Sequence, residues 1–396
     1  MKRAAILLLL LSVSLASFGH SRVAIERIWT IESDGSPFEF TGAVAVNNSN
    51  QKVISLTTSE GMDSFTDEND TVRVHIKGKG ESLVVLRAKA VVDIDYDTNV
   101  TTDPPLPFDG TEITPLTEYD TNISTQAVKL ADPGSSLTTV ASLVNWVHDN
   151  VEYDLSYWGK IKSAREVFAE RRGVCVEYTH LLISLLRSLG FEARYVNGYV
   201  KAANWQPHAW AEVNIPGYGW LPADATFGQA GILDNTHLAI DYGLDQASAY
   251  DLLLTQDENA KISVSEKVNA NFLSEDPKGV GVELGYDGSY AEVKLANNRT
   301  DYVLGTYTFF APEPFGTGNS SVIVLPPSKT IYRYQQVNYS ISEGTFGDVP
   351  VSASFNDASD SLVIGPLGTG GPSGAGCCAP AMLLFALALL AFRQAA

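Results

Sequence analysis

The sequence predicts an α+β domain placed between two all-β domains of sandwich type. Three patterns indicate this. Residues 20–121 alternate between apolar and polar side chains in short runs, which clusters of Asn, Asp and Gly separate, as is typical of strands. Residues 122–256 change to the period of amphipathic helices, and residues 257–366 return to strand alternation with recurring turn residues. A chain of 396 residues has room for three such domains.

The charge balance excludes nucleic acid as a partner. The chain has 27 Lys and Arg against 46 Asp and Glu, which gives a formal net charge of −19. Phosphate backbones are bound by clusters of Lys and Arg, and the sequence has no such cluster beyond a few residues. The acidity by itself predicts solubility and no particular partner.

The N-terminus has the pattern of a secretory signal peptide, which we assign to residues 1–19. Lys2 and Arg3 precede an apolar run over residues 4–11, and several small residues follow, such as Ser14, Ala16, Ser17 and Gly19. A basic start, a short apolar segment and a small-residue exit are typical of a segment that is removed after export. The apolar run is shorter than the ~20 residues that span a bilayer. The sequence therefore predicts a secreted protein.

The C-terminus is predicted to tether the protein to a membrane. Residues 367–376 form a Gly-rich linker, and residues 377–396 begin with Cys377 and Cys378 and continue as an apolar run. Its uninterrupted apolar part is also shorter than the ~20 residues of a spanning helix. The tail resembles archaeal C-terminal sorting signals, which can be exchanged for a lipid anchor. We therefore expect an archaeal-type protein on the extracellular face of the cell membrane, held there by a C-terminal membrane anchor or sorting tail.

Seven Asn-x-Ser/Thr sequons predict a glycoprotein and agree with secretion. A glycan is bulky and must face solvent. The gap between the fourth and fifth sequons is therefore consistent with a compact central domain that carries a working cleft. The sequon asparagines are Asn47, Asn69, Asn99, Asn122, Asn298, Asn319 and Asn338.

One cysteine stands alone in the body of the chain. Of three cysteines, two lie in the C-terminal tail, so Cys175 has no partner for an internal disulfide. A single thiol in a secreted protein pairs between molecules, packs in the core or reacts. The residues after it are apolar at helical spacing, and Gly190 is placed to end this helix. Cys175 is therefore expected at a helix N-terminus, where backbone N–H groups and the helix dipole favour a thiolate and can receive an oxyanion.

A hairpin is predicted to supply the base and its orienting carboxylate. Residues 208–213 and 220–224 alternate as strands, with turn residues between them. If the turn centres on Pro216, the numbers of paired residues sum to 432 and His208 lies opposite Asp224. Asp224 would then hold one ring nitrogen and leave the other for the thiolate. The alternative is a hairpin whose His and Asp share a surface only, and a slip of one residue would turn Asp224 away.

The other histidines have no setting that suggests catalysis. His20 lies at the exit of the signal segment, and His180 follows the thiol on another face of the helix. We interpret the remaining three as structural. They are His75, His148 and His237.

Five spaced motifs carry a resemblance to a known family. They occur in the order Gly173-x-Cys175-x-x-Tyr178, then the run from Gly190 to Tyr199, then His208-Ala-Trp210-Ala-Glu212, then Gly219-Trp220, then Asp224-Ala-Thr226. Together they resemble the transglutaminase-like superfamily over residues 136–240. The resemblance implies a papain-like α+β catalytic core with Cys175 as nucleophile, His208 as general base and acid, and Asp224 as the orienting residue. Val174 and Ala225 depart from residues frequent in the family, and neither carries a reacting atom.

The resemblance implies acyl transfer on a peptide or carboxamide bond of a protein or peptide substrate through a thioester. Water as the second substrate makes a protease or amidase, and an amine makes a crosslinking transglutaminase. We favour hydrolysis because it needs fewer special features. Gln206 and Trp158 are candidates for a second oxyanion donor.

Two other classes of function were compared with catalysis. His208 and Glu212 have the i, i+4 spacing of zinc ligands on a helix, but they lie on a predicted strand, and neither HExxH nor paired cysteines support a zinc site. The acidic residues 67–70 lack the ligand spacing of a calcium loop. We therefore expect no metal and no cofactor. A non-catalytic surface module that binds neighbouring cell-surface molecules stays an alternative.

Overall fold

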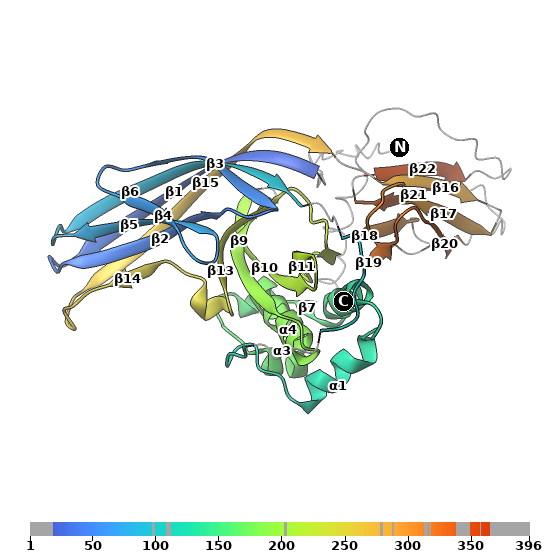
Figure 1. Ribbon diagram of the computed structural model, residues 1–396, viewed down its shortest axis with the longest axis horizontal. Coiled ribbons are helices and arrows are strands. Elements are labelled where there is room, and N and C mark those ends of the chain that lie inside the picture. Colours follow the sequence, from blue (N-terminus) through green and yellow to red (C-terminus); the bar gives the residue numbers. More distant parts are fainter. Residues whose placement is uncertain are drawn as a thin grey trace, which may run out of the picture.

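A computed structural model of the protein describes residues 19–96, 100–107, 112–201, 204–277, 280–286, 289–312, 316, 318–337, 349–356 and 358–364. Figure 1 shows three parts along the long axis, with strands at both ends and the helices in the middle. Nearly all of the expected signal segment, the linker and the C-terminal tail lie outside the described residues. Within the described part of the chain, no helix is long and apolar enough to cross a membrane.

The first part is a sandwich of two four-stranded antiparallel sheets around an apolar core that includes Ile25, Trp29 and Phe40. The prediction of an all-β N-terminal part is confirmed. In order across the first sheet, the strands are β15 (Ile262–Pro277), β1 (Gly19–Ser33), β6 (Leu83–Asp95) and β3 (Gln51–Thr58). Those of the second sheet are β14 (Leu252–Leu254), β2 (Phe38–Val46), β5 (Thr71–Gly78) and β4 (Asp63–Thr66).

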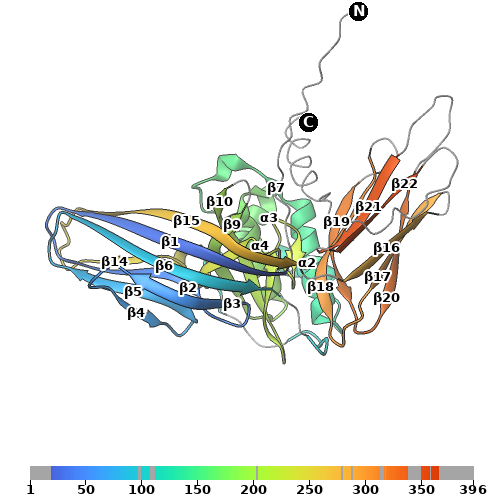
Figure 2. The same ribbon diagram turned by 90° about the horizontal axis from the view of Figure 1, so that it is seen from above.

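The predicted domain boundaries are wrong for this sandwich. β15, assigned from the sequence to the C-terminal domain, pairs with β1 from Ser33↔Ile262 to Gly19↔Pro277, and β14 pairs with β2. Figure 2 shows β15 and β1 side by side along the length of the sheet. The middle part of the chain is therefore inserted into the first sandwich. An alternating strand has the same pattern in either sheet, so the sequence does not indicate which partner it selects.

The segment before the helices also belongs with the middle part rather than with the N-terminal domain. Asp103 accepts hydrogen bonds from the Ser135 hydroxyl at 2.5 Å and from the Leu137 backbone N–H at 3.0 Å, at the start of helix α2 (Ser136–Asn150). The Ser136 backbone N–H donates to Pro104 at 2.7 Å. Ser135 is the N-cap of this helix, and its hydroxyl accepts the Thr138 backbone N–H.

The middle part packs helices against a five-stranded antiparallel sheet. The sheet order is β12 (Gln229–Ala230), β11 (Gly219–Asp224), β10 (Trp205–Ile215), β9 (Ala193–Lys201) and β13 (His237–Gly243). Helix α4 (Cys175–Ser188) lies against β10 and β9, and α1 (Thr121–Leu130), α2 and α3 (Ala164–Glu170) surround it. The short segments are β7 (Glu152–Tyr153), η1 (Leu155–Tyr157), β8 (Arg172–Gly173) and η2 (Gln246–Ser248).

Helix α4 forms where the apolar spacing predicts it. Leu181, Leu182 and Leu185 are completely buried, because this helix is enclosed by the sheet and by the other helices. Gly190 ends it in the left-handed region with φ +90°, and the Phe191 N–H donates back to the Leu186 carbonyl at 3.2 Å. The helix therefore places Cys175 at its first residue, as expected.

The C-terminal part is a second two-sheet arrangement, with Val293, Tyr307 and Phe355 in its core. This agrees with the expected sandwich. Its sheets are β16 (Gly281–Tyr286), β17 (Tyr290–Ala296) and β20 (Thr330–Gln336), and β19 (Asn319–Leu325), β18 (Val303–Phe310), β21 (Val349–Phe355) and β22 (Ala358–Ile364).

Both sandwiches contact the loop between β11 and β13. From the C-terminal sandwich, the Thr306 hydroxyl donates to the Gly228 carbonyl at 3.2 Å, and the Leu304 carbonyl accepts the Ile232 N–H at 3.0 Å. From the first sandwich, the Ser21 hydroxyl donates to the Asn235 carbonyl at 3.2 Å. The flanking domains thus fix the loop that follows Asp224.

Candidate active site

Cys175 begins α4 and is buried, with 5% of its surface exposed. The Glu177 carboxylate caps the helix by accepting the Val174 backbone N–H at 3.0 Å. A Cβ at Gly173 would lie 2.3 Å from the Glu177 Cβ, so only glycine fits beside this cap. Because the first backbone N–H groups of a helix have no partner within the helix, they are available to an oxyanion next to Cys175.

The hairpin has a different register from the predicted one. Glu212 pairs with Pro222 and Ala211 with Ala223, so the numbers sum to 434 rather than 432. The turn centres on Gly217, which adopts φ +78°, instead of on Pro216. A shift of two residues leaves each side chain on the same face of the strand. His208 and Asp224 therefore still share a face, as diagonal rather than directly opposed neighbours.

The structure brings the three predicted site residues together. His208 Nε2 lies 2.7 Å from Asp224 Oδ2, and Cys175 is near enough to contribute to the raised pKa of the His208 ring. His208 is 6% exposed and Asp224 is completely buried. One nitrogen of the His208 ring is therefore held by a carboxylate, and the same ring interacts electrostatically with the Cys175 side chain.

Electrostatics favour the charged forms of His208 and Asp224. Burial alone would lower the pKa of His208, but the Asp224 carboxylate and the contact with Cys175 outweigh it and raise the pKa to about 10. Burial would raise the pKa of Asp224, but His208 and then His237 hold it well below its usual range. An imidazolium paired with a carboxylate is therefore the stable state of this pair.

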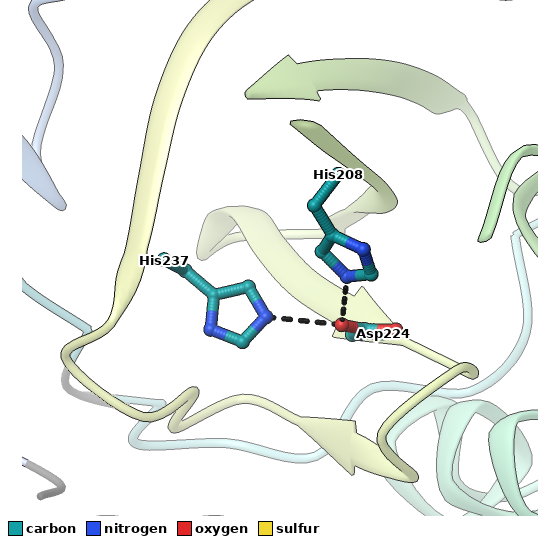
Figure 3. A group of neighbouring side chains, drawn as sticks. All are labelled: His208, Asp224 and His237. Carbon is teal, nitrogen blue, oxygen red and sulfur yellow. Dashed lines mark hydrogen bonds and ion pairs between the residues drawn. The ribbon is translucent and has the colours of Figure 1, made fainter. Parts of the chain in front are cut away.

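A fourth residue of the site was missed by the sequence analysis, which treated His237 as structural. His237 begins β13 and is completely buried, with Nε2 3.0 Å from Asp224 Oδ2 and Nδ1 2.9 Å from Asp234 Oδ1. Figure 3 shows the rings of His208 and His237 pointing at the same Asp224 oxygen. The spacing between Asp234 and His237 does not predict a role for His237 at the site. His237 reaches the site because β13 pairs with β9, and local sequence does not indicate this pairing.

Among the described residues, His208, Asp224 and His237 are the group close enough to hold a metal ion, with ligand atoms within 4.8 Å of one another. However, both ring nitrogens point at one carboxylate oxygen at 2.7 and 3.0 Å, which are hydrogen-bond distances. A metal would instead need all three atoms to point at a common centre about 2 Å away. We therefore interpret the group as hydrogen-bonded, and the expected absence of a metal stays a prediction.

The two candidate oxyanion donors differ in position. Gln206 lies on β10 two residues before His208, so it shares that strand face, and its side chain is exposed. Trp158 follows η1 and is 59% exposed. The backbone between η1 and Cys175 is tied down, because the Asp154 N–H donates to the Gly173 carbonyl at 2.9 Å. Both assignments therefore stay predictions.

A cavity of about 610 Å³ lies away from this site, at the turn end of the β10–β11 hairpin. Its walls include Arg187, Arg194 and Trp220 but none of Cys175, His208 or Asp224. The Arg194 guanidinium is paired with the buried Glu212 carboxylate at 2.6 Å, so its charge is already neutralised within the protein. The cavity is therefore separate from the thiol chemistry.

Comparison with known proteins identifies the middle part. Residues 124–225 match the family model described as the transglutaminase-like superfamily. The middle part of the chain is therefore similar to the transglutaminase-like superfamily. The matched span contains Cys175, His208 and Asp224, whereas His237 lies beyond its end.

Curated relatives of the transglutaminase-like domain are mycobacterial. An uncharacterized protein of Mycobacterium leprae is 26% identical over 122 residues, which cover 28% of this chain and 43% of the relative. An uncharacterized protein of Mycobacterium tuberculosis is 34% identical over 121 residues, or 26% of this chain and 38% of the relative. The chain thus spans less than half the length of these relatives. They give no support to the expected archaeal type.

Two solved structures align with the chain. A candidate cysteine protease from Cytophaga hutchinsonii aligns with 22% identity and a TM-score of 0.47, over 65% of this chain and 93% of that protein. A transglutaminase from red sea bream aligns with 9% identity and a TM-score of 0.22, over 89% of this chain and 78% of that protein.

The ion pairs of the site predict how stability depends on pH. The pKa values of His208 and His237 are raised to about 10 and about 9, above the ordinary value near 6.5. Between those values the folded protein keeps protons that the unfolded chain has lost, so the free energy of unfolding falls as the pH rises. We expect the thermal unfolding midpoint to decrease as the pH is raised from about 6.5 to about 10. The fall should be less steep in His237→Gln, and equal slopes in the two proteins would contradict the assignment.

Proposed function

We propose that this protein is an extracellular cysteine hydrolase that cleaves peptide or carboxamide bonds through Cys175, His208 and Asp224. The observation that carries the proposal is the position of His208, whose Nε2 lies 2.7 Å from Asp224 Oδ2 and whose pKa is raised by both Asp224 and Cys175. A thiol at a helix N-terminus and beside an oriented imidazole has the setting of a nucleophile. The match of this segment to the transglutaminase-like superfamily supports the same chemistry.

The proposed reaction has two steps. The Cys175 thiolate bonds to the carbonyl carbon, and the carbonyl oxygen becomes an oxyanion that faces the N–H groups at the start of α4. As the C–N bond breaks, the imidazolium of His208 gives its proton to the departing nitrogen, which leaves a thioester on Cys175. Water then attacks the thioester, gives a proton back to His208, and releases the acid product and the thiolate.

An amine in place of water would turn the same thioester into a new amide bond. Hydrolysis is the proposal because it requires no second binding site for an amine. A transglutaminase proper and a non-catalytic surface module are the outcomes that the experiment below separates.

We also propose that the protein acts at the cell surface, anchored by its C-terminus. The basis is the sequence pattern of residues 1–19 and 377–396. Four sequon asparagines are exposed, which is what a glycan needs. They are Asn69, Asn122, Asn298 and Asn319.

The test is incubation of the purified protein with a peptide library, with and without a primary alkylamine, followed by mass spectrometry. Hydrolysis predicts peptide fragments in both samples and an acyl adduct on Cys175 when the reaction is quenched with acid. Amine-containing products that replace the fragments would indicate the transferase. Cys175→Ala is the control, and equal products from this variant, or none from either protein, would contradict the proposal.

A further inference from the structure

His237 lies between two buried carboxylates. Its Nε2 faces Asp224 Oδ2 at 3.0 Å and its Nδ1 faces Asp234 Oδ1 at 2.9 Å. The side chain of His237 is completely buried, so no water shell competes for these contacts. The protonation state of His237 can therefore be deduced from what each carboxylate oxygen accepts.

Asp224 is surrounded by donors on both oxygens. Oδ1 accepts the backbone N–H groups of Thr226 at 2.7 Å and Phe227 at 3.2 Å. Oδ2 lies 2.7 Å from His208 Nε2. Oδ1 cannot carry a proton because it faces two backbone donors, and His208 and His237 hold the pKa of Asp224 well below its usual range, so the Asp224 carboxyl is ionised.

Asp234 is in the same situation. Oδ1 accepts the Thr236 backbone N–H at 3.0 Å, and Oδ2 accepts Gln229 Nε2 at 2.9 Å. The orientation of the Gln229 amide is fixed, because its oxygen accepts the Asp234 backbone N–H at 3.0 Å. Asp234 is therefore also ionised, and both nitrogens of His237 must carry protons to satisfy two acceptors.

We propose that His237 is a positioning residue of the active site, a buried imidazolium that is held by Asp234 and shares one Asp224 oxygen with His208. The catalytic consequence rests on the proposed function. From His208 outward, the charges then alternate along His208, Asp224, His237 and Asp234. Each N–H that bonds to the shared oxygen takes part of its charge, so His237 weakens the hold of Asp224 on the His208 proton. In the proposed reaction, His208 gives the proton on its other ring nitrogen to the leaving group. A weaker interaction between Asp224 and the His208 imidazolium makes this transfer easier.

The surroundings of His237 agree with a charged ring. Burial alone lowers its pKa, but Asp234 and then Asp224 outweigh this and raise the pKa to about 9. The other titratable groups that face it are His208, at a ring separation of 5.6 Å, and Tyr96, at 6.5 Å. Burial raises the pKa of Tyr96 well above its usual range, so this phenol stays neutral. The rings of Trp210 and Phe227 cover the remaining sides.

The test uses histidine-labelled full-length protein and NMR, in a Cys175→Ala background that needs no activity. We expect His237 to give imidazolium shifts between pH 5 and about pH 8. His237→Gln removes the positive neighbour of Asp224, so the pKa of His208 should rise by roughly one unit. Asp234→Asn removes one anion from His237, so the pKa of His237 should fall by roughly one unit. His75→Gln, on β5 beside Thr41, is the matched control and should move neither value.

Two results would overturn the proposal. One is a neutral His237 at pH 7 in the folded Cys175→Ala protein. This result would contradict the proposal even if the further variants fail to fold. The other is an unchanged His208 pKa in folded His237→Gln. Enzyme kinetics provide a separate measurement. In His237→Gln, the alkaline limb of the pH profile of kcat/KM should shift to higher pH. If the NMR result holds and no substrate is turned over, the proposed function fails and the proton assignment stands.

Discussion

Replacing His208 by Ala is expected to lower kcat/KM by about a thousandfold or more. The reason is that one ring performs two tasks in the proposed reaction, since it is held by Asp224 and interacts with Cys175. Without it the thiolate loses its counter-ion, and the departing nitrogen loses its proton donor. The rate of alkylation of Cys175 by iodoacetamide near pH 6 should fall together with kcat/KM, because both depend on the thiolate.

The matched control for His208→Ala is His75→Ala. His75 lies on β5 with its ring on Thr41 and contacts none of the site residues named above. Its kcat/KM and its alkylation rate should stay within a factor of about two of the parent. Retention of a tenth or more of the parent activity in folded His208→Ala would contradict the assignment of His208 as the proton donor.

Asp224→Asn is expected to cost a similar factor, about a thousandfold, although the side chain keeps its shape. The local hydrogen bonds decide which way the new amide faces. Oδ1 accepts two backbone N–H groups, so the amide oxygen must take this place and the NH₂ group must take the place of Oδ2. The NH₂ then donates to His208 Nε2 and places the ring proton on Nδ1, toward Cys175. In this tautomer the ring can no longer accept a proton from the thiol.

The readout for Asp224→Asn is kcat/KM together with the thermal unfolding midpoint. The substitution also leaves the buried His237 facing a donor, so the midpoint should fall as well. Asp241→Asn is the matched control, since Asp241 is another buried carboxylate of the same sheet and is paired with Arg73 at 2.7 Å. It should alter the midpoint without altering kcat/KM by more than a few fold. Equal losses of activity in the two variants would indicate that Asp224 has only a structural role.

The inserted position of the catalytic part explains how a loop can hold charged groups out of water. The backbone between Asp224 and His237 is tied to the C-terminal sandwich at Gly228 and Ile232. It is tied to the first sandwich at Asn235. Gly231 approaches the C-terminal sandwich so closely that a Cβ there would lie 2.6 Å from the Leu304 Cβ and carbonyl oxygen. The two sandwiches therefore hold the backbone between Asp224 and His237 in place.

Local sequence was sufficient for the elements that carry the reacting atoms. The apolar spacing after Cys175 determines α4 and places the thiol at its start, because helical periodicity is a property of one short segment. Strand alternation likewise determines that His208 and Asp224 share a face, because an even shift of register leaves that face unchanged.

Only the tertiary structure decided the rest. The hairpin register depended on the turn, which centres on Gly217 because glycine adopts the positive φ of +78° that Pro216 cannot adopt. The return of β14 and β15 to the first sandwich, and the arrival of His237 beside Asp224, depend on strands that pair across long stretches of chain. Such pairing is set by burial of whole faces in the folded molecule, which no local pattern encodes.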